Sequence, residues 1–127
     1  MTKLDPPCAF TLKPLEPINT RLFLLWLMGR LKRRRVFGES MQPTLRHGSE
    51  VLINTRKGLL KMLDKGDIVL IEHPYQPKHV IKRIDHYNQD RSAVFVTGDN
   101  ANESTDSRSY GLIPAKRIIG KVICQFS

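Results

Sequence analysis

Residues 66–85 read GDIVLIEHPYQPKHVIKRID, and two short runs within them are typical of β-strands. The runs are Ile68–Glu72 and His79–Asp85, both rich in Val and Ile. Gly66-Asp67 precedes the first run, and Pro74-Tyr75-Gln76-Pro77 separates the two; both segments are turn signals. The sequence therefore predicts two strands with a turn between them.

The same pattern continues on both sides of these residues. Three further strands are predicted at Val51–Asn54, Ala93–Thr97 and Ile118–Cys124. Turn residues interrupt them at Gly48, Asn88-Gln89-Asp90 and Gly98-Asp99-Asn100. Residues 36–127 are enough for one modest hydrophobic core, so we expect a small, mostly β domain there.

Residues 1–35 have a different composition. They hold eight Lys/Arg and two acidic residues, so most of the net charge of +9 lies in this part of the chain. Its first 20 residues carry four prolines, which indicates an extended arm. Thr20 is a suitable N-cap for a basic amphipathic helix from Arg21 to about Arg35. The apolar stripe predicted for this helix consists of Leu24, Leu27, Met28 and Leu31.

Length and composition exclude several classes of protein. The chain has 127 residues, which suits one small domain, and its 40% apolar and 26% charged residues are ordinary globular usage. Cys8 and Cys124 offer neither metal-ligand spacing nor a disulfide-rich scaffold. We expect two free thiols in a reducing compartment, and a single bridge between the two ends of the chain is the alternative. The longest apolar run, Leu22–Gly29, is shorter than a membrane span. Its basic cluster follows it, unlike that of a secretory signal.

A rigid turn is predicted at Gly38-Glu39-Ser40-Met41-Gln42-Pro43-Thr44-Leu45. Gly38 permits close backbone approach, and Pro43 fixes φ and removes a hydrogen-bond donor. A serine in such a turn can face outward with its own N–H free, which is the geometry of a nucleophile with an oxyanion donor. Most serines are ordinary loop residues, and the segment alone leaves both interpretations of Ser40 open.

Lys82 lies inside the predicted strand His79–Asp85, on the same face as Val80 and Ile84. Burial between aliphatic side chains lowers the pKa of a lysine, and a neutral lysine can act as a general base. If the face points outward, Lys82 is only solvated. Arg83 lies on the opposite face and competes for the inward position, so the alternation alone does not decide between them.

The segment Gly98–Gly111 is long, polar and dense in Gly, Asn, Asp and Ser. Such residues hydrogen-bond to their own backbone and build ordered turns. Asp99, Asp106 and Arg108 can also supply a partly buried, charge-assisted pair that makes the segment rigid. The alternative is a solvated surface loop.

Taken together, these segments resemble type I signal peptidases, including the mitochondrial inner-membrane peptidases. The resemblance covers roughly residues 36–123 and implies a signal-peptidase-like β domain with serine endopeptidase activity and no metal or other cofactor. The motifs that carry it are Gly38-x-Ser40-Met41-x-Pro43-Thr44-Leu45, Gly66-Asp67-Ile68-Val69, Lys82-Arg83, and Gly98-Asp99-Asn100…Ser104-x-Asp106-Ser107-Arg108-x-Tyr110-Gly111-x-Ile113-Pro114.

The resemblance implies a role for each matched side chain. Ser40 matches the nucleophile and Lys82 the general base, so that Lys82 and not Arg83 should face inward. Ser104 matches the serine that orients the lysine amine. The supporting residues are Asp106 with Arg108 as a structural pair, Asp99 and Asn100 in the same segment, and Met41 next to the nucleophile. Gly38 stands where many bacterial members have a hydroxyl donor, so the Ser40 backbone N–H is the expected oxyanion donor.

Two departures from the family pattern narrow the prediction. Typical members have one or two membrane spans, and larger ones insert a β domain in the interval that here runs from Lys82 to Gly98. We expect neither in this chain, which would make it a minimal catalytic core. Short relatives of this kind include the maturation proteases of nickel-type superoxide dismutase. Removal of a leader from that proenzyme is therefore our most specific prediction.

Two other functions remain as alternatives. The first is a general leader peptidase that docks on an anionic membrane through residues 21–35. In the other interpretation of that helix, its apolar stripe packs on the domain and its arginines are solvated. The second is a nucleic-acid-binding module, which the short basic segment and the lack of an aromatic platform disfavour. We expect a precursor protein as partner, no nucleic acid, and a location in the cytoplasm or at the membrane surface.

Overall fold

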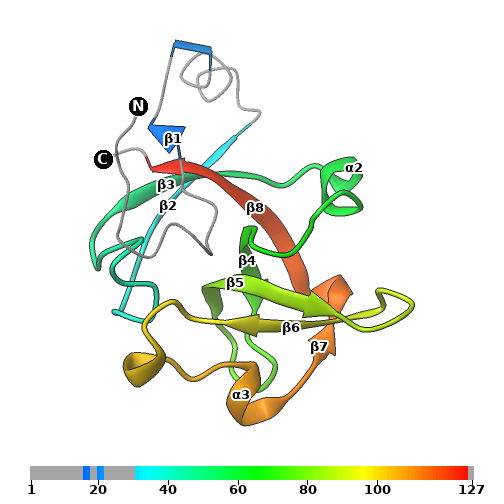
Figure 1. Cartoon of the computed structure of the whole chain (residues 1–127). Helices are drawn as coiled ribbons and strands as arrows, with labels where there is room; N and C mark the ends of the chain where they lie inside the picture. The colour runs from blue at the N-terminus through cyan, green and yellow to red at the C-terminus, as the bar shows by residue number, and fades with distance from the viewer. Residues whose placement is uncertain (1–15, 18–19, 22–30, 126–127) are drawn as a thin grey trace.

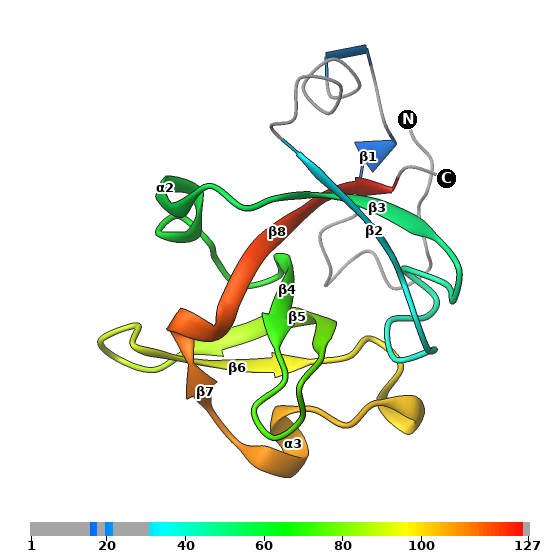
Figure 2. The same ribbon diagram turned by 180° about the vertical axis from the view of Figure 1, so that it is seen from behind.

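The computed structural model describes residues 16–17, 20–21 and 31–125 of the chain. Within these ranges, eight strands form one curled sheet in the order β2-β3-β8-β4-β5-β6-β7, with β1 paired to β8 off this path (Figure 1; Figure 2). The strands are β1 (Glu16–Pro17), β2 (Lys32–Arg35), β3 (Glu50–Asn54), β4 (Ile68–Glu72), β5 (His79–Tyr87), β6 (Ala93–Thr97), β7 (Ile113–Pro114) and β8 (Ile118–Gln125). The helices between them are α2 (Lys57–Leu60), η2 (Ala101–Glu103), α3 (Ser107–Tyr110) and η3 (Ala115–Arg117).

The mostly β fold predicted from the sequence is confirmed. Strands β4 and β6 have the predicted bounds, while β3, β5 and β8 are one or two residues longer than expected. Their pairing is antiparallel throughout, from β3 with β8 to β5 with β6. Among the residues that the structure describes, no helix is long and apolar enough to cross a membrane.

The predicted helix at Arg21–Arg35 is wrong for its last five residues, since Leu31 lies in a bend and the other four form a strand. Lys32–Arg35 form β2, an edge strand that pairs antiparallel with β3 and exposes all four side chains. Glu50 on β3 is the physical reason, because Arg33 and Arg35 both form ion pairs with it across the two strands. Charged side chains also suit a sheet edge. Thr20 and Arg21 are helical, and residues 22–30 lie outside the described residues.

Apolar side chains cover both faces of the β4–β5 pair. The first cluster contains Val36, Met41, Leu45, Val51, Ile53, Ile68, Leu70, Ile81 and Val122. The second contains Leu63, Val69, Ile71, Ile84, Val94, Val96, Ile113 and Ile118. Successive residues of β4 and of β5 alternate between the two clusters, so the centre of β5 is buried on both sides. Both faces of this strand pair therefore point inward.

This double burial corrects one expectation about Lys82 and Arg83. We expected Lys82 and not Arg83 to face inward, but their exposed fractions are 4% and 3%. Alternation along β5 places the two side chains on opposite faces, and both faces are covered. The expectation for Lys82 agrees with the structure, and the expectation for Arg83 is wrong.

Candidate active site

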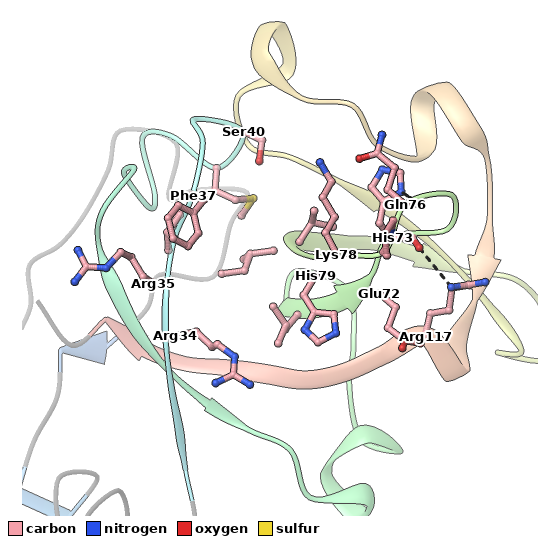
Figure 3. A pocket seen from close by; sticks show the side chains of 16 residues that line it. Arg34, Arg35, Phe37, Ser40, Glu72, His73, Gln76, Lys78, His79 and Arg117 are labelled. Carbon is pink, nitrogen blue, oxygen red and sulfur yellow. Dashed lines mark hydrogen bonds between the residues drawn. The ribbon is translucent and has the colours of Figure 1, made fainter.

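A groove of about 660 Å³ runs along the molecule between the segment from Arg34 to Met41 and the hairpin that joins β4 to β5. Ser40 lines one end of it (Figure 3). Its apolar lining residues are Val36, Phe37, Met41, Leu70, Val80 and Ile81, and its polar and charged ones include Arg34, Arg35, Glu72, His73, Lys78, His79 and Arg117. The groove thus combines apolar side chains with a ring of mostly basic groups.

Two buried side chains anchor the turn that holds Ser40. Met41 and Leu45 are almost completely buried in the first core cluster, and Leu45 N donates to Met41 O at 2.9 Å. Gly38 adopts φ +85°, a conformation that L side chains rarely adopt, and its N–H donates to His47 Nδ1 at 2.8 Å. These contacts leave Ser40 half-buried at the groove.

The backbone of Ser40 is held on its carbonyl side only. Its carbonyl oxygen accepts a hydrogen bond from Asn100 N at 2.8 Å, and Asn100 Nδ2 donates to the preceding carbonyl of Glu39 at 3.1 Å. Within the described residues the Ser40 N–H donates to no acceptor. A free N–H at this position is what an oxyanion donor requires.

Lys82 projects from β5 and is almost completely buried. Burial lowers the pKa of its ammonium group, and the charges of Arg108 and Lys78 lower it further, against the opposing effect of Asp106. Its Nζ donates to Ser104 Oγ at 3.1 Å. No hydrogen bond joins it to Ser40 Oγ in the part of the chain that the structure describes. The site thus holds a lysine whose environment favours the neutral amine.

Ser104 links this lysine to a buried carboxylate. Its Oγ donates to Asp106 Oδ2 at 2.6 Å, while it accepts from Lys82. Asp106 also accepts from Gly98 N at 2.7 Å and from Arg108 Nε and Nη2 at 3.0 and 2.6 Å. The charge-assisted pair predicted from the sequence is therefore present between Asp106 and Arg108.

The ionisation of Asp106 fixes the direction of these hydrogen bonds. Burial alone would raise the pKa of its carboxyl group, but the hydrogen bonds from Arg108, Ser104 and the Gly98 amide together outweigh burial and hold that pKa well below its usual range. Asp106 is therefore an acceptor at neutral pH. The Ser104 hydroxyl has one proton, so it donates a single hydrogen bond, which goes to Asp106, and its oxygen accepts the one from Lys82.

Gly98 is the point at which the Ser40 turn meets the Lys82 network. A Cβ atom at Gly98 would stand 2.3 Å from Ser104 Oγ and 2.6 Å from the carbonyl oxygen of Ser40. Both groups therefore approach the same face of the Gly98 backbone. Since Ser104 is hydrogen-bonded to Lys82, the structure brings the three predicted residues Ser40, Lys82 and Ser104 to one place.

Arg83 has a structural role that the sequence analysis missed. Its Nε and Nη2 donate to the two carboxylate oxygens of Asp99 at 2.9 Å each, and its Nη1 donates to Gly66 O at 2.6 Å. Asp99 also accepts from Thr44 Oγ1 at 2.6 Å. This buried pair connects β5 to the Ser40 turn, whereas we expected Asp99 to join Asp106 and Arg108. The sequence signal for this role was the position of Arg83 next to Lys82 in the predicted strand.

His73 is a second groove residue that the sequence analysis missed. Its Nδ1 accepts from the backbone N–H groups of Tyr75 and Gln76 at 3.0 and 3.1 Å. Partial burial lowers the pKa of the His73 imidazole, and the charges of Lys78 and Lys82 lower it further. The described residues contain no group of three or more His, Cys, Asp or Glu that is placed to hold a metal ion.

Known proteins match this chain over most of its length. The model of the family "Signal peptidase, peptidase S26" matches residues 18–85 and 88–126. Mitochondrial inner membrane protease subunit 1 of Xenopus tropicalis is 30% identical over 104 residues, which cover 67% of this chain and 62% of that protein. The subunit 1 protein of Schizosaccharomyces pombe is 35% identical over 107 residues, covering 69% of this chain and 68% of that protein.

A plant relative gives the same result. Mitochondrial ATP-independent inner membrane protease subunit 1a of Arabidopsis thaliana is 32% identical over 110 residues, covering 69% of this chain and 66% of that protein. The chain spans less than two thirds of the length of the Xenopus protein. The chain belongs to the signal peptidase family, peptidase S26.

Proposed function

We propose that the chain is a leader peptidase in which Ser40 is the nucleophile and Lys82 is the general base. The observation that carries the proposal is the buried Lys82, which is hydrogen-bonded to Ser104 next to the Ser40 carbonyl. A lysine in this environment loses its proton more easily than a solvated one. Arg83 is not a candidate base, because arginine does not deprotonate in proteins.

The hydrogen-bond directions suit this role. The Ser104 hydroxyl donates its hydrogen bond to Asp106, so its oxygen is free to accept one from an N–H of Lys82. In the neutral amine this arrangement leaves a lone pair for the proton of Ser40. The hydrogen bond between nucleophile and base is absent in the structure, and such bonds often tighten only when substrate binds.

The proposed reaction has two halves. Lys82 accepts the Ser40 hydroxyl proton while Oγ attacks the scissile carbonyl, and the free Ser40 N–H stabilises the oxyanion. The protonated lysine then gives its proton to the leaving amine, and an ester joins Ser40 to the leader. In the second half, Lys82 takes a proton from water, and the water oxygen attacks the ester carbonyl. The ester C–O bond then breaks, Lys82 returns the proton to Ser40 Oγ, and the leader leaves with a free carboxylate.

The proposed substrate is a precursor protein with an N-terminal leader. Membership of the signal peptidase family supports a leader peptidase in general. Nothing in the comparisons points to the nickel superoxide dismutase proenzyme, so this specific precursor stays a prediction. Coexpression with that proenzyme, followed by mass spectrometry of its N-terminus, tests it; an intact leader beside an active protease would contradict it.

Contact with an anionic membrane is a second proposal. Lys32–Arg35 form an exposed basic strand, and the neighbouring Phe37 is 76% exposed. Basic groups next to an exposed aromatic ring suit an anionic lipid surface. Flotation with phosphatidylserine vesicles should carry the protein at low salt and release it at high salt. Failure to float at low salt would contradict the contact. The cellular location stays a prediction.

Mutation of Ser40 tests the peptidase proposal. Ser40→Ala should abolish cleavage of a leader-bearing precursor, measured by mass spectrometry of the product N-termini, because it removes the attacking oxygen. The matched control is Ser49→Ala, which changes a serine of the same turn region that does not line the groove. Cleavage by the folded Ser40→Ala protein would contradict the proposal.

A further inference from the structure

The groove that begins at Ser40 carries more positive than negative charge. Its charged lining residues are Arg34, Arg35, Lys78 and Arg117 on the basic side, and Glu72 is the acidic one among the described lining residues. Arg35 already forms an ion pair of 2.8 Å with Glu50, which it shares with Arg33. The basic excess of the groove therefore comes from Arg34, Lys78 and Arg117.

These three cations have no carboxylate partner among the described residues. Arg34 makes a hydrogen bond of 3.2 Å to the carbonyl of Arg33, and Arg117 makes one of 3.4 Å to the carbonyl of His73. Arg34 and Lys78 are exposed. Their charges are thus available to a molecule in the groove. Glu72 contributes one negative charge against the three positive ones of Arg34, Lys78 and Arg117.

Arg34 and Lys78 come from opposite walls of the groove. Arg34 belongs to β2, and Lys78 belongs to the β4–β5 hairpin (Figure 3). The charge of Lys78 contributes, after burial, to the lowered pKa values of His73 and Lys82. Lys78 lines the same groove as Ser40, and its side chain points toward the end of the groove where Ser40 lies (Figure 3).

We propose that this groove selects precursors that carry Asp or Glu on the segment bound in it, with Lys78 recognising a carboxylate near the scissile bond and Arg34 one farther from Ser40 along the groove (Figure 3). The proposal rests on the leader peptidase function and names the substrate class of the same site. A peptide is the favoured ligand because the groove is continuous with Ser40 and offers apolar residues between its cations. Complementary charge of this kind sets specificity more than total affinity.

Pairs of leader peptides that differ only in a carboxylate or an amide at one position test whether the groove recognises acidic residues. Each pair carries Asp or Asn at a single position, and the position is scanned along both sides of the cleaved bond. We expect kcat/KM to favour Asp by about fivefold or more at one or two positions, in line with a few partly exposed charge pairs. High salt should reduce this preference.

Matched variants assign the preference to the groove. Arg34→Gln and Lys78→Gln should each reduce the ratio of Asp to Asn peptides, and together bring it close to one. Arg46→Gln and Lys61→Gln remove the same charges from exposed positions outside the groove and should leave the ratio unchanged. An equal ratio in wild-type protein and in the Arg34/Lys78 double variant would overturn the inference.

A binding measurement separates this inference from the peptidase proposal. Ser40→Ala protein should bind the Asp peptide more tightly than the Asn peptide in fluorescence anisotropy. If Ser40→Ala still cleaves, the peptidase proposal fails while the binding preference stands. If Ser40→Ala is inactive and binds both peptides equally, the peptidase proposal stands and acidic recognition is overturned. Loss of phosphatidylserine vesicle binding in Arg34→Gln and Lys78→Gln with an unchanged peptide ratio would also overturn it.

Discussion

Lys82 and Arg83 are neighbours on β5 and are equally buried, but their surroundings differ on the two faces of the strand. Arg83 meets Asp99 through two hydrogen bonds of 2.9 Å, so its charge is compensated directly. Lys82 meets the neutral hydroxyl of Ser104, and the carboxylate of Asp106 lies one residue further along the network. Arginine does not deprotonate in proteins, whereas a lysine that is buried without a carboxylate in direct contact tends to lose its proton.

Arg83 therefore supports the fold, and Lys82 supports the chemistry in the proposed mechanism. The guanidinium of Arg83 donates to both carboxylate oxygens of Asp99. Thr44 also donates to Asp99, so the pair holds β5 to the Ser40 turn. In the proposed peptidase, Lys82 is the proton acceptor next to Ser40, and its burial costs stability. Variants of Arg83, Gly98 and Ser104 should separate these two roles.

Loss of the Arg83 guanidinium should destabilise the fold most. Arg83→Met leaves Asp99 buried without its partner, and breaking such a pair costs about 3–5 kcal/mol of unfolding free energy. Denaturant titration of wild-type and variant proteins measures this. Arg35→Met is the matched control, because it breaks an exposed ion pair with Glu50 that is worth about 1 kcal/mol or less. Equal losses in the two variants would erase the proposed division.

A methyl group at Gly98 should lower activity strongly. In Gly98→Ala the new Cβ would stand 2.3 Å from Ser104 Oγ and 2.6 Å from Ser40 O, so the two segments must move apart. Misplacement of catalytic groups by about 1 Å can cost about 100-fold in rate, and we expect a loss of this size in kcat/KM. Gly58→Ala is the control, since no atom lies within 4 Å of a Cβ there. Circular dichroism verifies folding, and wild-type activity in folded Gly98→Ala would contradict the geometry.

Removal of the Ser104 hydroxyl should have a smaller effect. Ser104→Ala takes away one hydrogen bond to Lys82, and such a bond contributes about 1 kcal/mol, so turnover should fall by up to about tenfold without being abolished. Steady-state cleavage of one leader peptide measures it. An unchanged rate would remove Ser104 from the site.

Much of this fold could be predicted from local patterns. The strands β4 and β6 follow from runs of branched residues between turn signals, because such runs fit a pleated and buried surface. Strand β2 could not be predicted in this way. Its four consecutive cations become a strand only through a distant partner, Glu50, which local sequence does not reveal.

Some contacts of the candidate site could be predicted from the sequence, and others could not. The Asp106–Arg108 pair is two residues apart, so its formation could be anticipated from the sequence. The Arg83–Asp99 pair depends on how β5 is covered on both faces, and alternation along a strand predicts only one buried face. Tertiary packing decided the positions that the sequence left ambiguous.

The most direct test of the account is Lys82→Met, with cleavage and stability measured on the same preparation. The folded-state pKa of Lys82 is lowered, so between that pKa and its unfolded value of about 10.5 the unfolded chain binds more protons and stability rises with pH. Both within this window and below it the burial of Lys82 opposes folding, because the side chain must either lose its proton or bury its charge, and Met removes this cost. We predict that Lys82→Met is inactive and at least as stable as wild type at pH 7. An active variant, or an inactive one that has lost several kcal/mol of stability, would contradict the assignment of Lys82 as the base.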